Sequence, residues 1–377
     1  MMGKCTFVFL MMNLSFGFVP KAEAATSVYP GIRYISPYSE SLGGVTLPLS
    51  EEIGNSLFNN PAALARNTKF KSEFLNLTLD ANSVVLGSLG LSTLKITGLG
   101  GMSSTLNSNP NQLYSAGFGN LTALSWGGFA VGLLFQQRVR AYSDGTTANY
   151  ETTQDFVPTL GYGLALARGV VRLGYSFQYV NKTTGTSTSP SDSSASFMNG
   201  MAEGHGFSHN ASVNFVFPFA YLPTFSLLGR NIAGLHYSGG SLLPRAQNSS
   251  GLPADEKMSV DAAFNFTVRL SGSLKSVWYI QYKDLSSAAN LPFLERFNLG
   301  VDLAMSQSVG LRAGFTGSQF SAGLGYRSPS SEINLAWYHE RSPFANIAYW
   351  DTRYALQYKV FFREENTRDR DSEMKGK

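Results

Sequence analysis

The chain has 377 residues, of which 14% are charged and 13% are aromatic, and its formal net charge is +4. A charged fraction this far below the usual quarter is uncommon for a soluble protein. The small net charge, with no basic tract interleaved with aromatic residues, argues against nucleic acid binding. The single cysteine, Cys5, leaves the rest of the chain without a disulfide or a cysteine metal site.

The first residues have the pattern of a secretory signal peptide. Lys4 supplies a positive charge, Cys5 to Val19 form an apolar stretch, and Ala22-Glu23-Ala24 matches a small-residue cleavage site. We predict that residues 1–24 are a signal peptide cleaved after Ala24. The alternative is an uncleaved anchor, for which the apolar stretch is short.

The next segment, residues 25–67, lacks strand alternation and carries turn and helix-cap signals. Asn60 is a favourable helix cap, with Pro61 at the first helical position. Ala62 to Ala65 would then form one short turn that can pack closely inside a barrel.

From about Phe70 to Phe362, apolar residues alternate with polar or small residues at a period of two. Successive side chains of a strand point to opposite faces, so a run with alternating apolar and polar residues has one apolar face. The clearest example is the run Tyr354, Leu356, Tyr358, Val360 and Phe362, which alternates with Arg353, Ala355, Gln357, Lys359 and Phe361. Many such runs separated by polar turns, with no apolar run long enough for a membrane helix, predict a transmembrane antiparallel β-barrel.

We count about fourteen strands in an all-β domain over residues 68–363. A hairpin turn is expected at Arg168-Gly169, polar loops at 181–204 and 239–257, an irregular or partly helical stretch at 81–113, and a charged disordered tail at 364–377. The expected strands lie at about residues 70–80, 118–126, 129–136, 160–167, 172–179, 206–217, 223–238, 258–271, 274–284, 294–306, 308–316, 318–328, 331–341 and 352–363.

Three stretches resemble a known family. Ser41-Leu42-Gly43-Gly44, followed by an acidic, small-residue segment that ends in Asn60-Pro61-Ala62-Ala63-Leu64, resembles the start of FadL-type outer-membrane proteins. Leu228–Gly234 and the pair Leu311–Phe315 and Ser321–Tyr326 are similar to segments of the PorV-like branch of that superfamily. At Ala63 the transporters more often have glycine.

The resemblance implies a fourteen-stranded barrel in the outer membrane of a Gram-negative bacterium, with an N-terminal plug that we place at residues 25–67. It also implies plug residues at Gly43, Gly44, Asn60, Pro61 and Ala62. In the transporters of the family, ligands pass from the lumen sideways into the membrane.

Strand parity places several charges in the lumen, because a charge on the lipid face costs a few kcal/mol. The functional interpretation is a basic lumen that holds an anionic head group. The alternative is that these side chains sit at strand ends or pair with Glu51 and Glu52. The candidate ligand-binding residues are Arg138, Arg172, Arg269, Arg312 and Arg327, within a larger lumenal set that also contains Arg140, Arg353, Lys359 and Asp302.

Small inward residues, such as Gly161, Gly174 and Gly314, leave room for a plug or an apolar ligand, or relieve crowding in a curved sheet. Aromatic residues near strand ends predict an interfacial girdle: Trp126, Trp337, Tyr338, Tyr349 and Trp350. No residue pattern indicates a catalytic site, a metal site or a cofactor.

The expected function is binding or transport of hydrophobic molecules, such as long-chain fatty acids or lipids. The alternatives are a non-transporting PorV-like secretion subunit, a lipid-holding structural oligomer and a general porin. The expected partners are membrane lipids and a hydrophobic ligand, with a homo-oligomer or secretion-system proteins as further alternatives.

Overall fold

The computed structural model describes residues 31–50, 52–89, 106, 108–189, 200–219, 221–246, 249–271, 274–288, 292–317, 319–344 and 347–363. The predicted signal peptide (1–24) and charged tail (364–377) therefore lie outside the described residues, as does Glu51. Within the described residues, no helix has the length and apolar character to span a membrane.

Fourteen antiparallel strands form a closed barrel in which each strand pairs with its neighbours in the chain and β1 pairs with β14. The fourteen-stranded barrel predicted from the alternation is thus confirmed. The strands are β1 Lys71–Asn82, β2 Leu113–Trp126, β3 Phe129–Ser143, β4 Ala148–Leu166, β5 Val171–Ser189, β6 Ala202–Val216, β7 Thr224–Arg230, β8 Ser259–Ser271, β9 Leu274–Tyr282, β10 Phe297–Ala304, β11 Val309–Thr316, β12 Gln319–Arg327, β13 Ser331–Phe344 and β14 Ile347–Arg363.

Several strands differ from their predicted lengths. β4 begins at Ala148 instead of about residue 160, and β3 continues to Ser143 instead of ending at about residue 136. β7 ends at Arg230 instead of continuing to residue 238, because Asn231 and Ala233 adopt positive φ angles of 46° and 71° and turn the chain out of the sheet. β5 continues to Ser189 through a Ser/Thr-rich stretch that was expected to be a loop, because it pairs with β4 along its whole length apart from one two-residue gap. The predicted hairpin turn is present between β4 and β5, with Arg168 at φ 58° and Gly169 at φ 87°.

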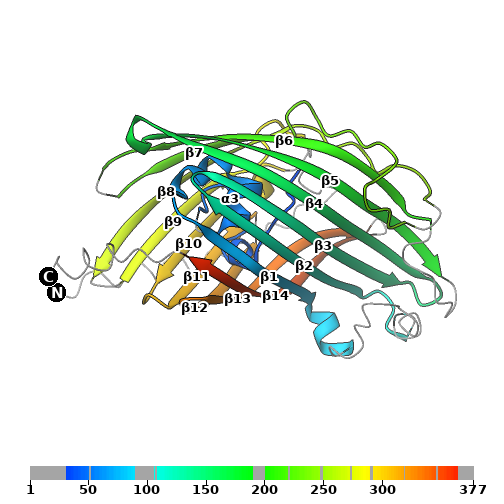
Figure 1. Cartoon of the computed structure of the whole chain (residues 1–377). Coiled ribbons are helices and arrows are strands. Elements are labelled where there is room, and N and C mark those ends of the chain that lie inside the picture. Colours follow the sequence, from blue (N-terminus) through cyan, green and yellow to red (C-terminus); the bar gives the residue numbers. More distant parts are fainter. Residues whose placement is uncertain are drawn as a thin grey trace, which may run out of the picture.

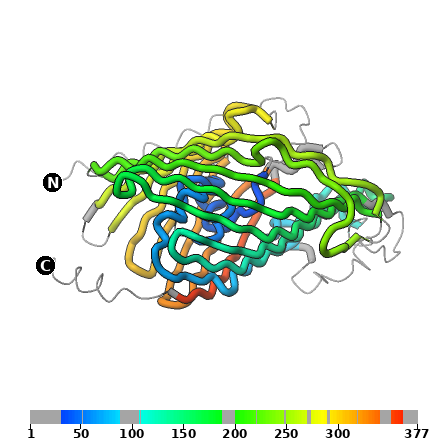
Figure 2. The backbone as a smooth tube through the Cα atoms, turned by 45° about the horizontal axis from the view of Figure 1, so that its top comes forward, coloured from blue at the N-terminus to red at the C-terminus, as the bar shows by residue number. Residues whose placement is uncertain are grey.

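The wall is taller on one side than on the other (Figures 1 and 2). β3 to β6 have 15 to 19 residues each, whereas β7 and β9 to β12 have seven to nine. At one barrel end, which we call the short-turn end, the strand connections are as short as residues 127–128. At the other, the long-loop end, they include residues 231–258.

The two faces of the wall differ as the parity rule requires. The outward face is apolar, with residues such as Leu160, Leu335 and Leu356 between 39% and 49% exposed. The inward face carries small and polar residues that are buried, among them Ser176 and Gln357. One girdle prediction is wrong: Tyr338 points inward, is 4% exposed and donates a hydrogen bond to Asp80.

Residues 31–50 and 52–67, which precede β1, lie inside the barrel, and we call them the N-terminal segment (Figure 1). It contains α2 (Pro37–Glu40), α3 (Ile53–Asn59) and the 3₁₀ helix η2 (Pro61–Arg66). α2 contacts β12 to β14, α3 contacts β1 to β4, and η2 contacts β3 to β6. The segment therefore crosses the lumen from one side of the wall to the other. Three further short helices among the described residues lie outside it: η3 (Val85–Leu89) after β1, η5 (Ala167–Gly169) between β4 and β5, and α5 (Phe293–Arg296) before β10.

Candidate functional site

The candidate site is the lumen together with the N-terminal segment that occupies it. The segment approaches the wall closely at two places, the first of which is the turn formed by Gly43 and Gly44, with φ angles of 71° and 73°. A Cβ on Gly314 of β11 would lie 2.0 Å from the Gly43 nitrogen, which donates a hydrogen bond to Ser321 Oγ at 2.9 Å. Glycine on both sides of this contact lets the two backbones approach.

The second close approach is at η2. Pro61 begins this helix, but Asn60 does not cap it as expected, because its side chain makes no hydrogen bond to the helix. Asn60 Nδ2 instead donates to Leu47 O at 2.7 Å, and Asn60 Oδ1 accepts from Ser212 Oγ at 3.2 Å. The amide of Ala62 donates to Ser212 Oγ at 2.7 Å. The Asn60 amide thus links the segment to itself and to β6.

Opposite η2, the wall again has glycine. A Cβ on Gly174 of β5 would lie 2.0 Å from the Ala62 nitrogen, and one on Gly163 of β4 would lie 2.4 Å from the Ala65 nitrogen. The small inward residues noted in the sequence therefore leave space that the N-terminal segment fills.

An apolar cluster forms between α3 and the tall side of the wall. Leu57 and Leu64 are fully buried, and a Cβ on Gly161 would lie 2.6 and 2.9 Å from their methyl groups. The cluster contains Tyr34, Ile53, Leu57, Phe58 and Leu64 of the segment, Leu121, Ala123, Ala130, Leu134, Val157 and Val180 of the wall, and Leu235 and Tyr237 of the β7–β8 connection. The interior on this side is a packed core.

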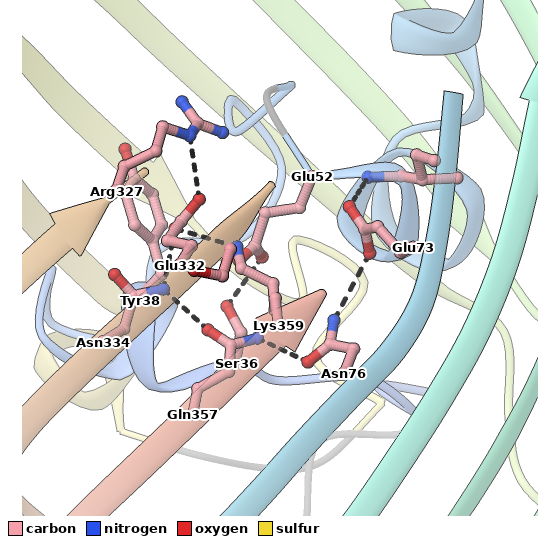
Figure 3. Close-up of polar contacts among 12 residues, drawn as sticks. Ser36, Tyr38, Glu52, Glu73, Asn76, Arg327, Glu332, Asn334, Gln357 and Lys359 are labelled. Carbon is pink, nitrogen blue, oxygen red and sulfur yellow. Dashed lines mark hydrogen bonds and ion pairs between the residues drawn. The ribbon is translucent and has the colours of Figure 1, made fainter. Parts of the chain in front are cut away.

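On the opposite side of the lumen, buried ion pairs join the segment to the wall (Figure 3). Glu52, which precedes α3, accepts from Lys359 Nζ of β14 at 2.7 Å, and Lys359 also pairs with Glu332 of β13 at 2.9 Å. Glu332 in turn pairs with Arg327 of β12 at 3.1 Å. Ser36 Oγ donates to the other Glu52 oxygen at 2.8 Å. Glu52 and Lys359 are almost completely buried, so neither has water as an alternative partner.

A second anchor joins the start of the segment to the β7–β8 connection. Arg33 forms an ion pair with Glu256, which also pairs with Lys182 at 3.1 Å and accepts from Tyr237 Oη at 2.8 Å. Burial by itself would raise the pKa of Glu256, but Arg33 and Lys182 hold that pKa below its ordinary range. Sequence reasoning missed this anchor, because Arg33 and Glu256 are 223 residues apart.

Arg230 is a further lumenal charge that was not among the candidates. It is fully buried at the end of β7 and pairs with Asp261 of β8 at 2.8 Å. Its Nη1 atom donates to Asn59 Oδ1 of the segment at 2.8 Å. The inward parity of Arg230 and Asp261 on neighbouring strands was a signal that could have identified the pair.

Three of the five candidate arginines are neutralised by acidic side chains of the wall. Arg138 pairs with Glu340 at 2.9 Å, and Arg327 pairs with Glu332. The Arg312 guanidinium lies 3.6 Å from Asp302 and 4.0 Å from the centre of the Tyr38 ring.

The other two candidate arginines, Arg172 and Arg269, lie next to the turns at the short-turn end. The structure therefore does not bring the five guanidinium groups together into one basic surface. Among the described residues, no cluster of three or more His, Cys, Asp and Glu side chains is placed to hold a metal ion.

Comparison with known proteins gives likeness in structure alone. No protein-family model and no curated protein sequence matches the chain. Among solved structures, the CymD monoaromatic hydrocarbon channel aligns with a TM-score of 0.53 at 11% identity, over 89% of this chain and 100% of CymD. The toluene transporter TodX of Pseudomonas putida aligns with a TM-score of 0.50 at 12% identity, over 90% and 99% of the two chains.

A TodX variant named deltaS2S3 aligns with a TM-score of 0.51 at 10% identity, over 88% of this chain and 99% of the variant. At such low identity these likenesses establish the fold, which is the one that the sequence resemblance implied. The chain has the fold of the FadL-type outer-membrane barrels.

Proposed function

We propose that the protein is an outer-membrane channel for hydrophobic molecules, such as long-chain fatty acids, lipids or hydrocarbons, and that the N-terminal segment is its gate. The observation that carries the proposal is the apolar cluster between α3 and the wall, inside a barrel with the fold of hydrocarbon channels. A general porin has a polar, water-filled lumen instead.

The connections at the two barrel ends support an orientation in the membrane. Barrels of this class have short periplasmic turns and longer extracellular loops. We therefore place the short-turn end at the periplasm and the long-loop end, with residues 231–258, at the cell exterior. In this orientation the Arg33–Glu256 anchor lies towards the exterior, and η2 lies towards the periplasm.

Gating requires that part of the segment moves, and the two sides of the lumen differ in the cost of that motion. Separating Leu57 and Leu64 from the wall exposes apolar surface, which a hydrophobic ligand would cover again. Separating Glu52 from Lys359 would leave the buried Glu52 carboxylate without its cation. We propose that α3 and η2 move away from β2 to β6 while the ion pairs hold, and that the ligand leaves sideways into the membrane.

A reversible crosslink tests the gate. The expected mature chain has no cysteine, so Ala62→Cys with Ser212→Cys introduces one pair at a position where Ala62 N and Ser212 Oγ are 2.7 Å apart. We expect uptake of labelled oleate or hexadecane by cells carrying the oxidised variant to fall to background and to recover after reduction. The single variant Ser212→Cys is the matched control and should be insensitive to oxidant.

The outcomes separate the gate from the channel. Equal uptake in the oxidised and reduced states would contradict a moving segment but not a channel. Absence of uptake by the wild-type protein, together with proteins that co-purify with it, would favour the secretion-subunit alternative. Deletion of residues 41–65 should raise the conductance of the barrel in a planar bilayer or alter uptake, and no change in either would count against a gate.

A further inference from the structure

The outward face of the tall side carries an apolar groove of about 470 Å³, across β2 to β5. The side chains that line it outward belong to alternate residues of these strands and are apolar except for Thr122 and the Tyr179 hydroxyl. They are Thr122, Leu124, Val131, Leu133, Pro158, Leu160, Phe177 and Tyr179. The groove is thus on the membrane side of the wall, not in the lumen.

Pro158 accounts for the groove. The ladder between β4 and β5 pairs Phe156 with Asn181 and Thr159 with Gln178, but it has no pair for Val157 or Pro158. Proline lacks the N–H that the ladder needs, and its ring does not extend from the sheet as a leucine side chain would. The larger neighbours Leu160 and Phe177 therefore stand around a depression.

Part of the β7–β8 connection covers the long-loop end of this groove. The Leu242 amide donates to the hydroxyl of Tyr179, which is a lining residue, at 2.9 Å. Asn181 Nδ2, one outward position further along β5, donates to Leu243 O at 3.0 Å. Leu242 and Leu243 are 73% and 50% exposed. Residues 241–246 therefore lie across the outside of the wall at the level where the groove ends.

This crossing places a cation at the end of the groove. The Arg245 guanidinium lies 5.9 Å from the centre of the Phe135 ring, directly beyond Leu133 on β3, and its Nη2 donates to Asn181 O at 3.0 Å. Its Nε and Nη1 atoms are buried and have no hydrogen-bond partner within the described residues. Glu203 lies beside this crossing, and its oxygens accept from Ser241 Oγ and from the backbone amides of Arg245 and Ala246.

We propose that the groove and Arg245 form a binding site for one lipid of the surrounding membrane that has a phosphate head group. An acyl chain lies along the groove between β2 and β5, and phosphate oxygens accept from the guanidinium of Arg245, whose Nε and Nη1 have no partner among the described residues. Guanidinium groups match phosphate geometry with two donors. This site is independent of the proposed transport, because the wall separates it from the lumen.

Lipid binding to the intact barrel tests the site. The protein in mild detergent is titrated with phosphatidylglycerol, with diacylglycerol of the same chains and with oleate, and the bound molecules are counted by native mass spectrometry. We expect Arg245→Gln to weaken phosphatidylglycerol binding about tenfold, which corresponds to the loss of one charged hydrogen bond. Binding of diacylglycerol, which has no phosphate, should be unchanged by this variant.

Two further variants complete the test. Leu160→Trp fills the groove and should weaken the binding of both phosphatidylglycerol and diacylglycerol. Arg168→Gln removes an exposed cation at the short-turn end and should leave the binding of both lipids unchanged. Equal phosphatidylglycerol binding by Arg245→Gln and the wild type would overturn the proposal. Tighter binding of oleate than of phosphatidylglycerol at this groove would also overturn it, because the occupant would then be the transported molecule. Folding of each variant is checked by the heat-dependent shift of the barrel on a gel.

Discussion

The two sides of the lumen hold the N-terminal segment by different physical means. Towards β12 to β14, the segment is fixed by buried charges, of which Glu52 and Lys359 are the central pair. Towards β2 to β6, it is packed by methyl groups and close backbone contacts, with Leu57 at the centre. Charge pairs are directional and costly to separate when buried, whereas apolar packing is non-directional. One side can therefore fix the position of the segment while the other separates.

The comparison predicts that the largest single effect comes from the charged side. Lys359→Met leaves Glu52 and Glu332 buried without their shared cation, and we expect a loss of about 3–5 kcal/mol in the free energy of unfolding. Urea unfolding of the refolded barrel in vesicles measures the loss. The double variant with Glu52→Gln should recover part of it, because Glu332 keeps Arg327. A double variant no more stable than the single one would contradict the assignment.

A smaller effect is expected on the apolar side. Leu57→Ala removes a fully buried side chain from the cluster and should cost about 2–4 kcal/mol, without leaving any unpaired charge. If this side is the moving one, the same variant should also increase ion conductance in a planar bilayer. Leu311→Ala, on the outward face, is the control for conductance and should leave it unchanged, because this side chain faces away from the lumen. Lower stability with unchanged conductance would assign Leu57 to packing alone.

The next largest loss of stability is expected at the close backbone contact between Gly43 and Gly314. Gly314→Ala would bring a Cβ within 2.0 Å of the Gly43 nitrogen and should destabilise the barrel by about 1–3 kcal/mol through overpacking. Gly310→Ala on the same strand is the matched control, because its nearest neighbour atom is 3.5 Å away. Equal stability of the two variants in urea would show that the segment does not press on β11.

The smallest effect is a pH dependence of the anchor at the long-loop end. The ion pairs of Glu256 with Arg33 and Lys182 hold its pKa below the ordinary value of 4.5, so they stabilise the fold above that pH. This stabilisation decreases as the pH falls below 4.5, because the unfolded state then binds the proton more readily. Glu256→Gln should therefore be less stable than the wild type at about pH 7 and approach it at about pH 3. A constant difference would contradict the pairing.

Much of the fold could be predicted from alternation alone. The inward position of Arg138, Arg353 and Lys359 followed from strand parity, because each faces away from the apolar side of its strand. Tyr338 was predicted on the wrong face, because a tyrosine near a strand end can lie either at the membrane interface or in the lumen. Only its hydrogen bond to Asp80 shows that it points into the lumen. The length of β5 was underestimated, because its Ser/Thr-rich end has a weak strand signal and is held by pairing with β4.

The sequence by itself determined the barrel, its strand number and the face on which each charge lies, because these depend on a period of two residues and on the exclusion of charge from lipid. Only the tertiary structure decided which charges meet and what occupies the lumen. Arg33 with Glu256, and Glu52 with Lys359, are joined by barrel closure and by the path of the N-terminal segment across it. Local sequence carries no information on contacts between residues so far apart, since these depend on the register of the whole sheet.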